Sequence, residues 1–336
     1  MKSSRFVQGC CAAVVALAVN MGAANGAQRF WSGSASNDWF VPSNWQSFNV
    51  PTATDDVLLP STLAGFPVPR TDVELTSSTT VNAMRVDILL YSAQQSLGYS
   101  LYGESGDTLT VTNGLSVESV SNIPGRFRVN GVGIQSASGF LGTGGELTLG
   151  DGAEWIASGT LNVGIIAKVV VNSETLSAGT LDLADESSTT INSGGTVSAG
   201  VLKAARNSNS GWGKPSITIN SGGTLELGFS ESHKITDGVL TLNPNGDIVM
   251  PSATLTLTGA DADTVFNTNY NVRSGSVLAL RDGADATSTS YLDVGYQNVG
   301  TLVVEDAGSS VTATGSTNSD WGFGSGAQAF VIFQTG

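Results

Sequence analysis

A degenerate repeat of about two dozen residues is the feature that most limits how this 336-residue chain can fold. Residues 276–284 read SVLALRDGA and residues 300–308 read GTLVVEDAG, so Leu278 recurs one period later as Leu302. In a second pair of segments, Ile217 recurs as Leu240 after nearly the same interval. A helix-free repeat of this length is typical of one coil of a parallel β-helix, in which every coil stacks its apolar residues on the next.

Short alternating runs separated by turn residues support this interpretation. After residue 27 no stretch repeats apolar residues at helical spacing over a dozen positions, whereas alternation such as TLTVT at residues 108–112 recurs. Asn, Asp and Gly punctuate the runs, as at 150–152, 192–195 and 220–223. These residues accept the tight and left-handed conformations of turns, so the sequence predicts an all-β chain.

An antiparallel sandwich or barrel is the competing architecture, because it also has short strands with regular turn signals. A sandwich or barrel, however, gives no reason for the pattern Leu-x-Val/Leu-x-x-Gly to recur at a regular interval along the sequence. The composition agrees with a solenoid: only 12% of the residues are charged, against about 25% in an average protein. Identical charges stacked at strand spacing repel one another, which favours neutral ladders of Ser, Thr and Asn.

The first 27 residues have the pattern of a secretory signal peptide. Lys2 and Arg5 form a basic start, residues 6–21 are mostly small and apolar, and residues 22–27 read GAANGA. The apolar run is shorter than the roughly 20 residues that cross a bilayer, so a cleaved leader is favoured over a membrane anchor. We therefore expect a protein located outside the cell or on its outer surface, with no transmembrane segment in the mature chain.

Small residues allow three cleavage sites, after Ala24, Gly26 or Ala27, and the last is the least attractive because Asn25 occupies the third position before the cut. Cleavage removes both cysteines, which excludes disulfides and thiol chemistry. It leaves 12 basic and 28 acidic residues, a net charge of −16. Such a chain has no positive surface for phosphates, so no nucleic acid partner is expected.

Three of the six tryptophans, Trp31, Trp39 and Trp45, are clustered in one short segment near the start of the mature chain. A solenoid has to cover the open end of its core, and tryptophans bury much apolar area with few residues. Residues 28–60 are therefore predicted to be an N-terminal cap. The alternative is an aromatic platform on which sugar rings stack, and it requires an exposed Trp39.

These residues also carry a resemblance. The elements W-x-G, D-W, N-W and P-x-x-x-D-D-V between residues 31 and 57 resemble the opening of bacterial autotransporter-passenger-like surface proteins. The later units L-x-V-x-D-G-A, L-x-V-G and G-T-L-x-V are similar to the repeat shared by autotransporters and proteins with a PEP-type C-terminal sorting signal. The resemblance covers most of the mature chain and implies a right-handed parallel β-helix displayed or secreted at the cell surface. The chain departs from the pattern because no Pro-Glu-Pro motif, apolar helix and basic tail closes it.

The last residues suggest an open edge. Residues 327–334 read AQAFVIFQ, a strongly apolar strand, and an exposed edge of this kind pairs readily with another chain. We expect either further coils in a longer protein, which is the favoured interpretation, or end-to-end self-association through 327–334. Residues 61–336 are assigned to the repeat domain.

Groups for acid–base chemistry are few. The single histidine, His233, lies between strand segments and is expected to be solvated rather than catalytic, and a zinc site lacks further ligands. Asp55 and Asp56 suggest a metal site, although carboxylates beside a strand more often bond to turn backbone. Arg126 and Arg128 share one strand face, which is either an anion-binding patch or a solvated surface.

An enzyme remains the alternative, namely a polysaccharide lyase or hydrolase whose carboxylates on adjacent coils act as acid and base or bind calcium. The candidate carboxylates are Asp185, Glu186, Asp261, Asp263, Asp282 and Asp285. Each can equally be a turn carboxylate that bonds its own backbone. We therefore assign no catalytic, cofactor-binding or metal-binding residue. The sequence favours a non-catalytic structural or adhesive protein of a bacterium, with extracellular glycans or neighbouring cell surfaces as partners.

Overall fold

The protein folds as a parallel β-solenoid of about nine turns. The computed structural model describes residues 26–60, 71–88, 90–92, 95–96, 98–119, 125–205, 213–228, 231–244, 247–250, 252–268, 270–273, 275–290, 292–295, 299–314 and 328–334. The predicted leader, apart from its last two residues, lies outside this part. The structure is 62% strand, and the one helical element in the described ranges is the 3-10 turn η1 (Pro42–Asn44). None of the described residues forms a helix long and apolar enough to cross a membrane.

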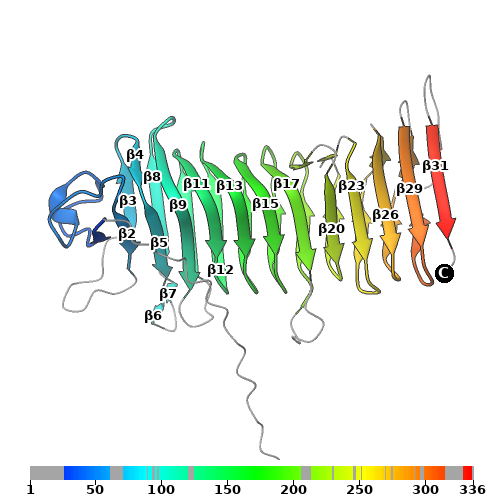
Figure 1. Ribbon diagram of the computed structural model, residues 1–336, viewed down its shortest axis with the longest axis horizontal. Coiled ribbons are helices and arrows are strands. Elements are labelled where there is room, and N and C mark those ends of the chain that lie inside the picture. The colour runs from blue at the N-terminus through cyan, green and yellow to red at the C-terminus, as the bar shows by residue number, and fades with distance from the viewer. Residues whose placement is uncertain are drawn as a thin grey trace, which may run out of the picture.

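Two large sheets wrap the core, and their strands stack side by side along the rod (Figure 1). The sixteen-stranded sheet has the order β1 (Gln28–Phe30), β2 (Asp56–Leu59), β5 (Ala83–Ile88), β9 (Thr108–Ser119), β11 (Gly133–Leu141), β13 (Glu154–Val163), β15 (Thr175–Leu183), β17 (Thr196–Ala205), β20 (Ser232–Thr236), β23 (Thr254–Thr258), β26 (Ser276–Arg281), β29 (Val299–Glu305) and β31 (Gln328–Gln334). Beside this path lie β4 (Thr79–Val81), β19 (Thr224–Leu227) and β22 (Asp247–Val249).

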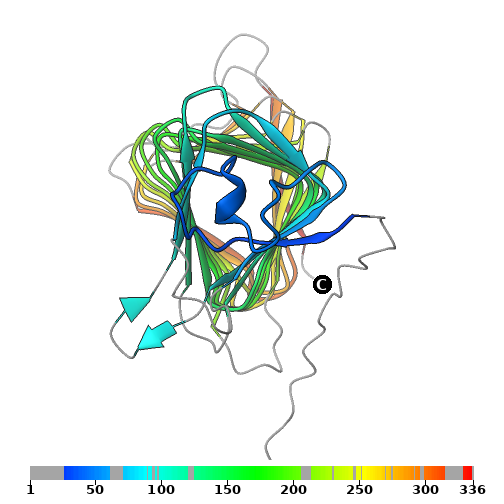
Figure 2. The ribbon, with the colours of Figure 1, turned by 90° about the vertical axis from the view of Figure 1, so that its left-hand side faces the viewer.

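The eleven-stranded sheet has the order β3 (Asp72–Leu75), β8 (Tyr99–Gly103), β10 (Gly125–Asn130), β12 (Gly145–Gly150), β14 (Lys168–Val171), β16 (Ser188–Ile191), β18 (Ser216–Ile219), β21 (Val239–Leu242), β24 (Asp263–Phe266), β27 (Asp285–Ser288) and β30 (Ser310–Ala313). Two pairs stand apart, the parallel β25 (Tyr270–Val272) with β28 (Leu292–Val294) and the antiparallel β6 (Leu90–Ser92) with β7 (Gln95–Ser96). Seen along the axis, successive coils superimpose around one common core (Figure 2).

The strand register confirms the repeat. Leu278 pairs with Leu302, and Ile217 pairs with Leu240, as the sequence spacing predicts. Coil length is variable, because the step along the chain from Lys168 to its partner Ser188 is shorter than the step from Ser188 to Ser216. Loop insertions thus change the length of a coil without breaking the stack.

One sequence alignment does not carry over to the fold. Residues 145–153 and 276–284 share the pattern Leu-x-Leu followed by Asp-Gly-Ala, yet β12 belongs to the eleven-stranded sheet and β26 to the sixteen-stranded sheet. The pattern specifies a half-buried strand followed by a turn, and both sheets require such units. It contains no information on which face of the coil the strand occupies.

A column of glycines lines the bend at which the long strands turn a corner. Its members are Gly159, Gly179, Gly200 and Gly228. A Cβ atom on Gly179 would lie 2.5 Å from the carbonyl oxygen of Ser158 and 2.9 Å from that of Gly159. On Gly200 it would lie 2.5 Å from the carbonyl oxygen of Gly179. Only glycine lets the coils stack at this corner, because the obstacles are backbone atoms of the preceding coil.

An asparagine ladder follows the strands of the eleven-stranded sheet. It consists of Asn172, Asn192, Asn220, Asn243 and Asn267. Each amide Nδ2 donates to the Oδ1 of the preceding ladder member, at 2.7, 2.7, 2.9 and 3.1 Å in chain order. The backbone N–H of Asn220 also donates to Ile191 O at 2.8 Å. The ladder therefore links five coils through side chains and main chain together.

Replacing Asn220 with alanine should lower the free energy of unfolding by about 2 kcal/mol, because two partly buried amide–amide hydrogen bonds are lost. Urea unfolding followed by circular dichroism measures the change. Asn162→Ala on the outer face of β13 is the matched control, and we expect it to stay within about 0.5 kcal/mol. Equal losses for both variants would show that the ladder adds nothing to stability.

The tryptophans form the predicted N-terminal cluster. Trp31, Trp39 and Trp45 are at most 1% exposed, and their rings meet edge to face, with centroids 5.1 Å apart for Trp31–Trp45 and 4.7 Å apart for Trp39–Trp45. Trp45 Nε1 donates to Trp39 O at 2.7 Å. The segment that carries them crosses the end of the coil stack (Figure 2). A sugar-stacking platform at Trp39 is therefore wrong, because its ring has no exposed face.

At the other end, β31 is the last strand in the order of the sixteen-stranded sheet. It pairs with β29 along its whole length, and Ile332 is 39% exposed. Within the described residues its second edge has no partner strand. The expected end-to-end association through this edge stays a prediction.

Candidate functional site

Three of the candidate acidic residues are held by contacts with neighbouring coils. Asp185 is buried, and its carbonyl accepts the N–H of Ile166 at 3.1 Å. Glu186 has the left-handed φ of 53°, and its N–H donates to Gly213 O at 2.9 Å. Asp282 also has a left-handed φ of 54°, and its carboxylate accepts the hydroxyl of Thr258 at 2.5 Å. These three residues have the turn positions that the structural interpretation predicts.

Two of the other candidates, Asp261 and Asp263, lie beside Lys214. Its Nζ lies 3.1 Å from Asp263 Oδ2 and 3.4 Å from Asp261 Oδ1. Burial opposes the charge on Lys214, but pairing with the two carboxylates outweighs it and raises the pKa of the lysine. Asp263 pairs in register with Asp285, whose Oδ1 accepts the hydroxyl of Ser310 at 2.6 Å. In the described part of the chain, no three His, Cys, Asp or Glu side chains could share a metal ion.

The expectation that His233 is a solvated loop residue is wrong. The side chain lies on β20 and is 1% exposed. Its Nδ1 accepts the N–H of Leu202 at 3.1 Å, and its Nε2 lies 3.4 Å from Gly228 O. Leu202 is located where β17 changes partner from β19 to β20, so the imidazole supplies an acceptor at this junction.

His233 should make the fold sensitive to mild acid. Burial lowers the pKa of His233, and it outweighs the opposing effects of Gly228 O and Glu231. Because the pKa of His233 is lower in the folded state than the ordinary value near 6.5, its neutral imidazole stabilises the fold when the pH is above 6.5. This stabilisation is lost as the pH falls towards the folded-state pKa. Urea unfolding midpoints at pH 7.5 and pH 5.0 should therefore differ more for the wild type than for His233→Gln, which cannot titrate but can still accept from Leu202. An equal difference in both proteins would contradict this role.

The arginine pair is placed as predicted on one face of β10, where Arg126 and Arg128 alternate with buried residues. Arg126 Nε lies 3.4 Å from Glu146 Oε2 on the next coil. This contact partly neutralises the patch, which weakens the interpretation as an anion-binding site. Asp55 and Asp56 differ from each other: Asp55 collects hydrogen bonds from the cap, and Asp56 accepts the side-chain amide of Asn82 at 2.7 Å.

A concave feature lies where the cap meets the first coils. We call it the threonine groove, and it has a volume of about 380 Å³. Its lining consists of Pro51, Thr52, Ala53, Ser78, Thr79, Thr80, Thr108 and Thr110. No lining residue is ionisable, and six carry a hydroxyl. Sequence reasoning missed the groove because its residues come from three separate segments.

Strand pairing builds one wall of the threonine groove. Thr80 on β4 pairs in register with Thr110 on β9, and Thr110 alternates with the buried Leu109 and Val111, so it faces outward. Ser78 Oγ accepts the N–H of Thr108 at 3.0 Å. The opposite wall is the cap loop 51–53. Neutral hydroxyls and methyl groups therefore meet in a depression of ligand size.

The fold and surface define a parallel β-solenoid protein. No family model, no curated protein and no solved structure matches the chain. The resemblance to autotransporter-like repeats is therefore a hypothesis about function.

Proposed function

We propose that this protein is an exported structural and adhesive β-solenoid of a bacterial cell surface, that it binds neutral glycans, and that it catalyses no reaction. The observation that carries the proposal is the threonine groove. Its hydroxyls can exchange hydrogen bonds with sugar hydroxyls, while the threonine methyl groups and the Pro51 ring can pack on sugar C–H groups. A neutral lining suits a neutral saccharide, and the acidic chain as a whole disfavours anionic ones.

The remainder of the rod supports an adhesive role. On the outer face of the eleven-stranded sheet, a ladder of threonines interrupted by valine repeats at the strand spacing of about 4.8 Å. Its members are Thr148, Val170, Thr190, Thr218, Thr241, Val265, Thr287 and Thr312. The asparagine ladder fixes the coils beside this face. Such a regular hydroxyl surface can contact a long polymer at many points.

Binding to neutral glycans tests the proposal. A glycan screen of the purified protein should yield neutral ligands, and Thr80→Val with Thr110→Val should weaken the binding about tenfold, because two hydroxyl hydrogen bonds are lost. Thr160→Val with Thr180→Val is the matched control, since this in-register pair on β13 and β15 lies outside both the groove and the threonine ladder. Unchanged affinity in the groove variant, or no neutral ligand in the screen, would contradict the role of the groove.

A carbohydrate-active enzyme is the second candidate, because Asp263 pairs in register with Asp285 on the adjacent coil and also contacts Lys214. The same purified protein can be tested for new reducing ends or unsaturated products from acidic and neutral polysaccharides. Turnover that Asp263→Asn or Asp285→Asn abolishes would replace the adhesive function with an enzymatic one. We expect none.

A further inference from the structure

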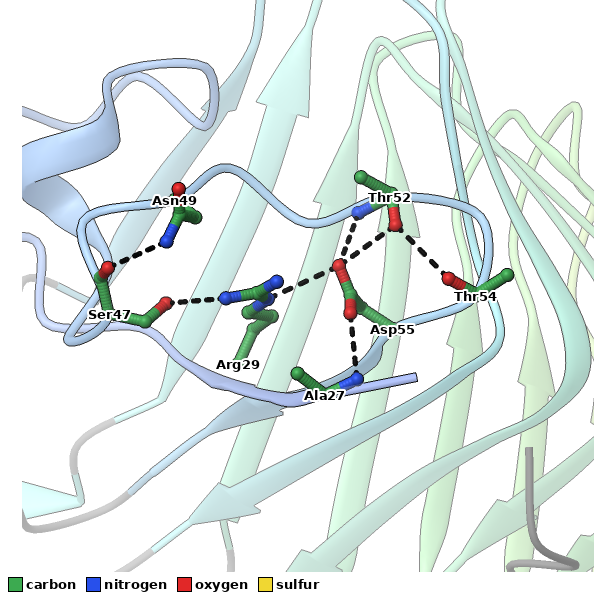
Figure 3. A network of polar contacts seen from close by, with 7 residues as sticks. All are labelled: Ala27, Arg29, Ser47, Asn49, Thr52, Thr54 and Asp55. Atoms are coloured by element: carbon green, nitrogen blue, oxygen red, sulfur yellow. Dashed lines mark hydrogen bonds and ion pairs between the residues drawn. The ribbon is translucent and has the colours of Figure 1, made fainter. Parts of the chain in front are cut away.

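The buried carboxylate of Asp55 collects hydrogen bonds from the first residues of the described chain. Asp55 is 3% exposed, and its Oδ1 accepts the N–H of Ala27 at 2.9 Å. Its Oδ2 accepts both the N–H and the hydroxyl of Thr52 at 2.9 Å each, and Arg29 Nε lies 3.2 Å from the same oxygen. Figure 3 shows Ala27 and Thr52 converging on this carboxylate from two sides. Asp55 therefore holds Ala27 and Arg29, near the start of the described chain, against the loop that follows Thr52.

Ala27 is fixed at both of its backbone polar groups. Its N–H donates to the Asp55 side chain, and its carbonyl accepts the N–H of Asp56 at 3.1 Å. From Gln28 onwards the chain pairs with β2 in register. Cleavage after Ala27 would therefore delete both contacts.

Gly26 is in a different position. A Cβ atom there would overlap the carbonyl oxygen of Thr54, so the backbone of Gly26 is crowded against the loop that presents Asp55. The sequence alone leaves cleavage after Ala24, Gly26 or Ala27 open. The contacts argue against cleavage after Ala27, because the N–H and the carbonyl of Ala27 are both hydrogen-bonded.

We propose that the leader is cleaved between Gly26 and Ala27 and that the new α-ammonium group of Ala27 forms an ion pair with the buried carboxylate of Asp55. This rests on the export proposed above. An endopeptidase of the export route adds water across the Gly26–Ala27 amide. The hydroxyl group joins the carbonyl carbon of Gly26, the C–N bond breaks, and the nitrogen of Ala27 takes the other proton of the water. The new carboxylic acid of Gly26 ionises at neutral pH, and the proton that it releases balances the one that converts the Ala27 amine into an ammonium. Ala24 and Gly26 supply the small residues at the third and first positions before the cut.

The ionised carboxylate of Asp55 favours this outcome, and Arg29 already pairs with its other oxygen. Burial would raise the pKa of Asp55, but the hydrogen bonds from Thr52 and Ala27 and the contact with Arg29 outweigh burial, so the pKa is lowered and the carboxylate is ionised. Cleavage changes a neutral amide donor into a charged donor at the same atom. Charge-assisted hydrogen bonds are shorter and about twice as strong as neutral ones. Maturation would therefore tighten the contact between the first strand and the cap.

Export of the full 336-residue chain from a bacterial host tests the cleavage site directly. Intact mass and N-terminal sequencing of the exported protein should give Ala27 as the first residue. A first residue of Asn25 or Gln28 overturns the proposed site but leaves the proposed export intact. A chain that is retained uncut inside the cell overturns both. The three results differ in mass and in location, so the failures are distinguishable.

The pH dependence of stability tests the ion pair. An α-amino group has an ordinary pKa of about 7.7 to 8.0, and a neighbouring carboxylate raises it. The stabilisation is then complete below the ordinary pKa and is lost as the pH rises through the raised value. Between pH 7 and pH 10 the thermal midpoint of the exported wild type should fall by about 3 °C more than that of Asp55→Asn. Thr52→Val removes one neutral bond to the same carboxylate and should keep the wild-type dependence.

A second measurement does not require the Asp55 variant to fold. An NMR titration of the isotopically methylated α-amine in the wild-type exported protein should give a pKa above the ordinary range. A pKa of about 7.7 to 8.0 for that amine would overturn the ion pair even if the cleavage site is correct. The same holds if the wild type and a folded Asp55→Asn protein lose stability equally at high pH.

Discussion

Gly179→Ala is expected to lower the free energy of unfolding by about 3 kcal/mol, although it adds a single methyl group. The new Cβ would lie 2.5 Å from Ser158 O and 2.9 Å from Gly159 O. Both obstacles are main-chain atoms of the preceding coil, and no side-chain rotation can move them. The coils would have to separate at the corner, which lengthens the strand hydrogen bonds on both sides.

Denaturant unfolding of Gly179→Ala measures this cost, and Gly150→Ala is the matched control. A Cβ on Gly150 would meet only the side-chain Oδ1 of Asn130, at 3.3 Å, which can rotate away. We expect the control to change stability by less than about 1 kcal/mol. If Gly179→Ala is no worse than Gly150→Ala, the corner is not closely packed and the glycine column has no structural role.

Trp45→Ala is expected to be the most damaging substitution in the cap, with a loss of about 4 kcal/mol. The Trp45 ring lies between those of Trp31 and Trp39, and it contacts both edge to face. Its removal leaves a cavity, breaks the hydrogen bond from Nε1 to Trp39 O, and opens the end of the core. Because each coil of a solenoid contacts only its neighbours, the damage should begin at the N-terminal coils.

Limited proteolysis with mass spectrometry locates this fraying, and urea unfolding gives its magnitude. Phe48→Ala is the matched control, since Phe48 is an aromatic residue of the same segment that is 71% exposed. We expect that control to stay within about 0.5 kcal/mol of the wild type. Cleavage that starts at the C-terminal coils of Trp45→Ala would contradict the capping role.

Only part of the candidate functional residues could be predicted from sequence patterns. Turn geometry was predictable for Asp282, because a carboxylate residue beside a glycine prefers turn positions that bond to nearby groups. The threonine groove was not, since Thr52, Thr80 and Thr110 are brought together only by the pairing of β4 with β9 and the placement of the cap loop. His233 was misjudged because its surroundings suggest a loop, whereas a change of strand partner buries it.

The sequence by itself determined the unit of this fold. The alternation of apolar and polar residues determined where the strands lie, and glycine and asparagine determined the turns between them. The spacing of Leu278 and Leu302 determined the length of one coil. The three early tryptophans marked the cap. These are local properties, because side-chain period and turn conformation depend on residues close together in the chain.

Only the tertiary structure decided what stacks on what. Because the coils differ in length, the sequence pattern does not identify which residue of the next coil lies beside a given side chain. An insertion in a loop changes that neighbouring residue. The amide bonds between Asn192 and Asn220, and the contact of Ala27 with Asp55, follow from this stacking. The physical reason is that a strand pattern fixes which face of the strand is buried, whereas the register between coils, set by loop length and packing, fixes the partner.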